Sequence, residues 1–124
     1  MSLSHSTHSS YLYLNVAQSL ENVGDADALQ DMLQMLHNML ASDVQQIDQC
    51  MDASDFSGAG QLLHALKGCI PIFCYPTLCQ ELTAVEQMSK SASPEGCAPA
   101  YVPLRTKLDA LRTEIGMYLA QTGG

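Results

Sequence analysis

The sequence is short of basic residues and of long apolar runs, and each shortage excludes a class of function. Only 5 of the 124 residues are Lys or Arg, against 13 Asp and Glu, so the formal net charge is -8. Nucleic acid and anionic membrane surfaces bind proteins through cationic contacts, so neither is expected as the main partner. No apolar run approaches the ~20 residues that cross a bilayer, and no signal-peptide pattern precedes the first helix. We therefore expect a cytoplasmic protein.

The cysteines lack the spacing of a metal site. They number five, which is odd, and no C-x-x-C pair occurs. A spacing of five between Cys69, Cys74 and Cys79 turns successive side chains around a helix instead of gathering them. We expect free, partly buried thiols and no bound metal, and a metal-binding bundle is the third alternative for function.

Apolar residues are plentiful, and their spacing is helical. Hydrophobic residues make up 47% of the chain and charged residues 15%, as in a globular domain that buries its own core. We predict a flexible tail over residues 1–10 and a single domain over residues 11–122. Apolar positions recur every three or four residues in four stretches. These are Leu29–Met51, Phe56–Phe73, Leu78–Lys90 and Tyr101–Leu119.

The four stretches and a shorter one over Tyr11–Val23 predict an all-α protein. Its expected architecture is an antiparallel, up-down-up-down four-helix bundle with a short N-terminal helix. Proline at position 71 should end or kink the second long helix. Helix starts are indicated at Asp25, at Ser54 or Asp55, at Tyr75-Pro76, and near Pro99 or Pro103.

Three methionines, Met32, Met35 and Met39, lie beside the apolar stripe of the first long helix. We expect them to widen the core; the alternative is that they form adaptable contacts on a protein-docking face.

The second long helix carries a histidine in unusual surroundings. His64, Lys67 and Gly68 share one stripe beside the apolar seam, at spacings of three and four. Glycine costs roughly 1 kcal/mol in a helix interior relative to alanine, so Gly68 needs a reason beyond helix formation. Gly60 and Gly68, one turn to either side, are expected to leave the ring accessible. The lysine places positive charge where an anion on the ring would lie.

The run His64-Ala65-Leu66-Lys67-Gly68 resembles the H-x-L-K-G signature of histidine-containing phosphotransfer (HPt) domains. Leu78 and the Val85-Glu86 pair stand where that family carries a downstream leucine and an L-E-like pair. The resemblance implies a four-helix bundle whose exposed histidine relays phosphate between aspartates of receiver domains. The chain departs from the family at Leu63, where Ala is usual, at Cys74, where Gly is usual, and at Pro71.

The resemblance implies a role for each residue of the motif. His64 is expected to accept the phosphoryl group, Lys67 to meet its oxygens, and Gly68 to give clearance. Glu86 is expected to accept an N–H of the ring and so orient it. The alternatives are a structural histidine, a solvated lysine, a tolerated helix glycine and a plain surface glutamate. Lys90 would lie one turn beyond Glu86, where it would add positive charge, but we do not count it among the site residues.

These residues predict a phosphocarrier in a two-component phosphorelay. A neutral imidazole offers one ring nitrogen as a nucleophile toward an aspartyl phosphate. The chain contains neither a P-loop nor a kinase glycine loop, so it is not expected to be an enzyme, and the Mg²⁺ would belong to the partner receiver. The expected partners are response-regulator receiver domains or a hybrid sensor kinase, met by a monomer through apolar contacts. The alternative is a helical adaptor that binds a receiver or kinase domain without being phosphorylated.

Overall fold

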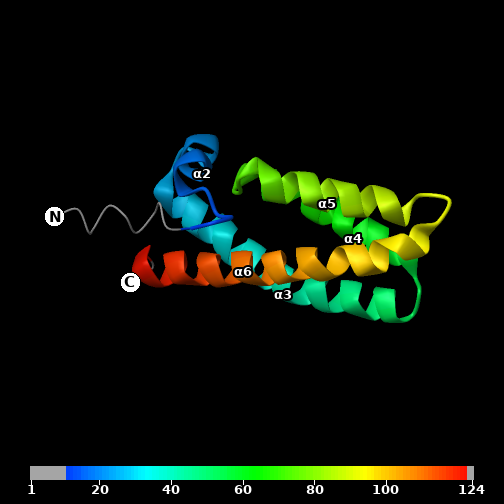
Figure 1. Ribbon diagram of the computed structural model, residues 1–124. Helices are drawn as coiled ribbons and strands as arrows, with labels where there is room; N and C mark the ends of the chain where they lie inside the picture. Colours follow the sequence, from blue (N-terminus) through cyan, green and yellow to red (C-terminus); the bar gives the residue numbers. More distant parts are fainter. Residues whose placement is uncertain (1–10, 123–124) are drawn as a thin grey trace.

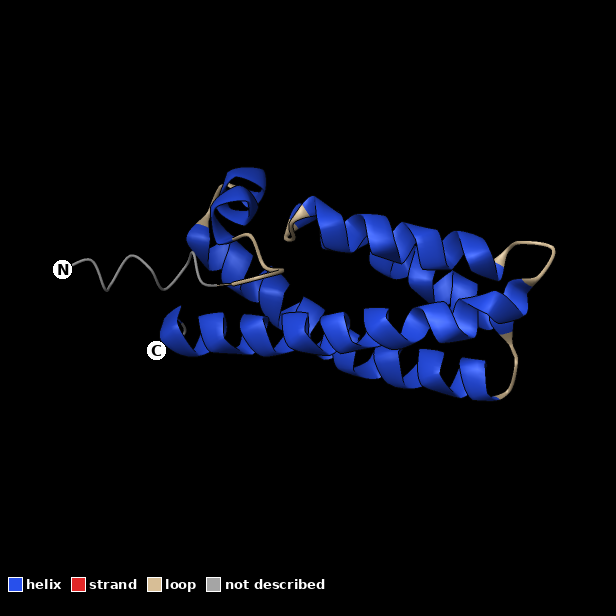
Figure 2. Cartoon of the chain, viewed as in Figure 1, coloured by secondary structure: helices blue, strands red, loops and turns tan. Residues whose placement is uncertain are grey.

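The computed structural model describes residues 11–122. The regular secondary structure in this range consists of helices (Figures 1 and 2). The predicted tail, residues 1–10, lies outside the described residues. The helices are α2 (Val16–Val23), α3 (Ala26–Asp52), α4 (Phe56–Cys69), α5 (Pro76–Ser89) and α6 (Cys97–Thr122), with 3-10 turns η1 (Ile70–Ile72) and η2 (Pro94–Gly96). The prediction of an all-α protein is confirmed.

The four long helices form a bundle in which each packs against two others. Helix α3 contacts α4 and α6, and α5 contacts the same two helices from the opposite corner. The chain reverses direction at each connection, and α2 lies across one end of the bundle beside the start of α3 (Figure 1). The predicted short N-terminal helix is therefore present. None of the described helices is long and apolar enough to span a membrane.

The long helices bury the predicted apolar seams. On α4 this seam is continued by Ile70 and Phe73 beyond the helix end, and only Phe56 at its start stays partly exposed. Asp25 caps α3 by accepting a hydrogen bond from the Ala28 amide, and Asp55 caps α4 by accepting one from the Gly58 amide. Both caps satisfy amides that a helix start leaves without intrahelical partners. Of the two predicted caps for α4, Asp55 is the one used.

The end of α4 is set by proline, as predicted. The α-helix stops at Cys69, and η1 carries Pro71 in its first turn, where a missing N–H costs least. Cys74 is buried and pairs in an isolated antiparallel bridge with Leu14. Helix α5 then begins at Pro76.

The last helix begins earlier than the sequence indicated. We expected a start near Pro99 or Pro103, but α6 begins at Cys97 and contains Pro103 in its interior. Pro99 is only the third residue of the helix, where backbone amides have no intrahelical partner to lose. Pro103 removes one hydrogen bond on an exposed face, and the buried Tyr101 and Leu104 on either side keep the helix packed.

The N-terminal segment is tied to the far end of the chain by one carboxylate. Glu114 on α6 accepts hydrogen bonds from three successive backbone amides, those of Leu12, Tyr13 and Leu14. The α4–α5 connection is held from the same side, because Ser19 Oγ donates to the Phe73 carbonyl and Asn15 N donates to it as well. The segment therefore closes one end of the bundle.

Candidate functional site

The imidazole of His64 is presented to solvent on α4. The side chain is 64% exposed, whereas Leu63 and Leu66 on the same helix are completely buried. Two buried leucines three residues apart fix the rotation of a helix about its axis. The ring is therefore held at the edge of α4 that faces α5.

A buried carboxylate on α5 lies directly beneath the ring. Glu86 is only 1% exposed, and its Oε2 lies 2.9 Å from Nδ1 of His64. Lys90 Nζ lies 2.6 Å from the same oxygen, and Lys67 Nζ lies 2.9 Å from Oε1. The contact between Lys67 and Oε1 is an ion pair, and its geometry falls short of a hydrogen bond. One carboxylate thus gathers the histidine and two lysines.

These contacts fix the protonation of the Glu86 carboxylate. Its pKa falls to about 2, because the ammonium groups of Lys90 and then Lys67 stabilise the charged form; burial opposes the shift, and His64 adds to it. An ionised carboxylate only accepts hydrogen bonds, so Nδ1 of His64 must donate. In the neutral ring the lone pair then lies on Nε2. The geometry selects the ring nitrogen that is free to react.

We expect the contribution of Glu86 to stability to disappear in acid. The group's pKa lies below its ordinary value of 4.5 in the folded chain, so its stabilisation is complete above that value and is lost as the pH falls toward 2. Glu86→Gln should lower the free energy of unfolding at pH 7 by about 1–2 kcal/mol, less than the full shift gives because both ammonium groups reach solvent. Urea unfolding from pH 7 to pH 2 should show the difference shrinking below pH 4.5.

The exposed Glu95 in η2 provides the matched control. Glu95→Gln should change the free energy of unfolding little at any pH. A Glu86→Gln difference that stays constant down to pH 2 would contradict the ion pairing described here.

The two glycines flanking His64 have different surroundings. A Cβ atom added to Gly68 would meet nothing within 4 Å, so this surface is open, as expected. Gly60 is buried, and a Cβ atom there would overlap Oγ of Ser89 on α5. The expectation that Gly60 clears the surface around the ring is therefore wrong. Its missing side chain lets α4 approach α5 closely at Ser89, three residues from Glu86.

Alanine substitutions should separate these two glycines. Gly68→Ala should raise the free energy of unfolding by about 0.5–1 kcal/mol, because alanine favours the helix and the site is open. Gly60→Ala should lower it by about 1 kcal/mol, because the overlap displaces Ser89 and exceeds the helix gain. Thermal unfolding of both variants measures this. Equal shifts of one sign would show that Gly60 is not a packing glycine.

The methionines of α3 line a groove instead of widening the core. Met35 is 71% exposed and Met32 is 37% exposed, and Met39 alone packs partly against the core. The expectation of core packing is thus wrong for the first two. All three methionines line an apolar groove of about 280 Å³. Its other walls are Leu36, Cys69, Ile72 and Phe73. The groove lies between α3 and the segment where α4 ends and η1 follows.

Sequence reasoning undervalued Lys90. The sequence predicts no role for this residue, yet it makes the shortest contact with Glu86. A glutamate four residues before a lysine on one helix is the favourable order for an ion pair, so the sequence did carry the signal. The five cysteines are free thiols. Within residues 11–122, no three His, Cys, Asp or Glu side chains are grouped as a metal site.

Comparison with known protein families gives a match. The family model described as Hpt domain matches residues 31–114, which is about two thirds of the chain. Its span includes α4, α5 and the residues gathered around Glu86. No curated protein and no solved structure matches the chain.

Proposed function

Because the chain belongs to the Hpt domain family, whose members act in histidine phosphotransfer, we propose that His64 accepts a phosphoryl group from a receiver-domain aspartate. The observation that carries this proposal is the exposed ring whose Nδ1 is bonded to a buried, ionised Glu86. A structural histidine would be buried and satisfied by its surroundings. Here one nitrogen is fixed and the other is left for a partner.

The proposed transfer needs no proton to move. The Nε2 lone pair attacks the phosphorus of the aspartyl phosphate, and a P–N bond forms as the P–O bond to the aspartyl carboxyl group breaks. The aspartate leaves as a carboxylate. The ring keeps its Nδ1 proton and becomes an imidazolium, which Glu86 stabilises by charge. The reverse sequence passes the group to a second receiver.

Lys67 and Gly68 complete the proposed acceptor site. Lys67 lies one turn from His64 on a long, flexible side chain, and it can turn from Glu86 Oε1 to the phosphoryl oxygens. The open surface at Gly68 leaves room for the partner's active-site loops. The chain acts as a carrier, and we propose that Mg²⁺ is supplied by the acidic site of the receiver.

We further propose that the receiver docks over the methionine groove. A stable protein interface buries about 800 Å² on each partner, far more than the surface around one ring, so a receiver that reaches His64 also covers neighbouring surface. The groove begins little more than one turn along α4, at Cys69, and its walls are apolar and adaptable. Apolar docking also suits a chain with a net charge of -8, since attraction between charges is not required.

A charge placed in this groove should weaken docking. We expect Met35→Glu to lower kcat/KM for transfer from a phosphorylated receiver about tenfold, because a carboxylate would be desolvated on binding. Met117→Glu, at an exposed methionine of α6, is the control and should have little effect. The measurement is the initial transfer rate as a function of chain concentration. Equal rates for both variants and the wild type would place the docking surface elsewhere.

Chemical lability of the label tests the proposed function. The chain is mixed with receiver domains that have been phosphorylated with acetyl phosphate and Mg²⁺, and transferred phosphate is followed. A phosphohistidine is labile in acid and stable in alkali, whereas an aspartyl phosphate is labile in alkali. We expect an acid-labile label that maps to the peptide containing His64. Binding of receivers without any label would instead support the alternative, a non-phosphorylated adaptor.

A further inference from the structure

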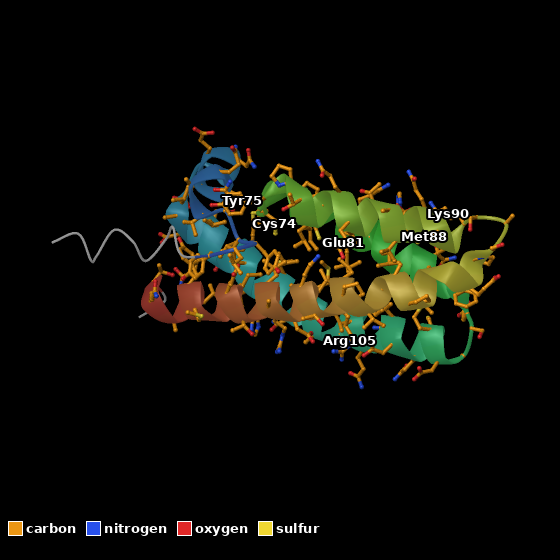
Figure 3. All side chains as sticks on the ribbon, viewed as in Figure 1. Cys74, Tyr75, Glu81, Met88, Lys90 and Arg105 are labelled. Atoms are coloured by element: carbon orange, nitrogen blue, oxygen red, sulfur yellow. The ribbon has the colours of Figure 1, made fainter. Side chains whose placement is uncertain are left out.

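Lys90 is the one charged group at the site to which the proposed transfer gives no role. It lies at the end of α5, beside Met88 (Figure 3). Its side chain is 61% exposed, yet its ammonium group is the closest of the three partners of Glu86. The i,i+4 spacing to Glu86 gives this contact a favourable geometry within one helix.

Phosphorylation changes which cations neutralise Glu86: the ring becomes a cation, and Lys67 leaves the carboxylate. Transfer adds a positive charge to the ring and two negative charges on the phosphoryl group, so the site becomes more negative by one charge. Lys67 must leave Oε1 of Glu86 to meet the phosphoryl oxygens. With Lys67 turned away, Lys90 is the remaining lysine on a carboxylate that is 1% exposed. Without it, only the imidazolium that carries the phosphoryl group would neutralise the buried carboxylate.

We propose that Lys90 is a positioning residue that keeps Glu86 neutralised while Lys67 turns to the phosphoryl group, and that it thereby favours the phosphorylated form of His64. Lys90 acts through Glu86 and does not contact the phosphoryl group. The inference rests on the proposed phosphotransfer at His64. It adds a residue that sets how the phosphoryl group is shared at equilibrium between this chain and its receiver.

The test measures the transfer equilibrium in a double-mutant cycle. A receiver that labels the wild type is brought to equilibrium with each variant, and the ratio of phosphorylated chain to phosphorylated receiver is determined. We expect Lys90→Met to lower this ratio about three- to fivefold, the scale of a partly exposed ion pair. Lys90→Arg should restore it. In the Glu86→Gln background, Lys90→Met should leave the ratio unchanged, because the charge to be neutralised is absent.

A matched control comes from an ion pair between α5 and α6. Lys107 on α6 pairs with Glu81 on α5, and Lys107→Met removes an ion-paired lysine away from His64. This variant should leave the ratio unchanged. Thermal unfolding checks that each variant is folded. An unchanged ratio in Lys90→Met overturns the inference, and so does an equal drop with and without Glu86. Absence of label on the wild type overturns the proposed function itself.

Discussion

Replacing His64 with glutamine is expected to abolish phosphoryl transfer to the chain. Glutamine keeps a polar side chain of similar reach and can still hydrogen-bond to Glu86 through its amide group. It has no ring nitrogen with a nucleophilic lone pair, so no P–N bond can form. The acid-labile label should therefore fall to background. The position is exposed, so the fold should tolerate the change with a cost within about 0.5 kcal/mol.

His37→Gln is the matched control for this experiment. His37 lies on α3, where its ring approaches Gly116 of α6, away from Glu86. The variant should accept phosphate as the wild type does, which shows that loss of any histidine is not the cause. Residual acid-labile label on His64→Gln would assign the acceptor to another residue and would refute the proposed site.

Truncating Leu66 should produce the largest loss of stability among the variants considered. Leu66 is completely buried in the seam of α4, and removing a buried leucine side chain to Cβ costs about 2–5 kcal/mol in lost burial and in the cavity left behind. Stabilities of single domains are commonly about 5–15 kcal/mol, so Leu66→Ala removes a substantial share. Urea unfolding at pH 7 measures the change.

The same substitution also tests what holds the ring in place. Leu66 directly precedes Lys67, so loosening its packing should slow transfer as well as lower stability. Val102→Ala, at a 64% exposed position on α6, is the control and should change the free energy of unfolding by less than about 0.5 kcal/mol. A loss of under 1 kcal/mol for Leu66→Ala would mean that the seam of α4 is not tightly packed.

Local patterns in the sequence were sufficient to predict the helices. The caps at Asp25 and Asp55 and the stop before Pro71 each depend on residues within one or two turns, and all three are found where they were expected. The start of α6 was misplaced because a proline near a helix start was taken as the start itself. Proline is tolerated throughout the first turn, so it marks that turn and not its first residue.

The environment of the site depended on helix packing, which the sequence alone did not supply. From the sequence, Glu86 fits a surface glutamate as well as a partner of the ring, and the contact between α4 and α5 is what buries it. Gly60 and Gly68 look alike in the sequence, since both lie one turn from His64. They differ because α5 covers one and not the other. The exposure of Met35 likewise follows from where α4 ends beside α3.

The N-terminal segment has a consequence for how this Hpt domain can be moved into another protein. The family match begins at residue 31, whereas the bundle end is closed by residues 11–24. A graft cut to the matched span would strip Glu114 of its three amide donors and leave the Phe73 carbonyl open to water. It would also expose the α4–α5 connection to solvent. This connection sets where α5 begins, and so it sets the position of Glu86 beneath the ring. A working transplant therefore has to start at Tyr11, well before the recognisable signature.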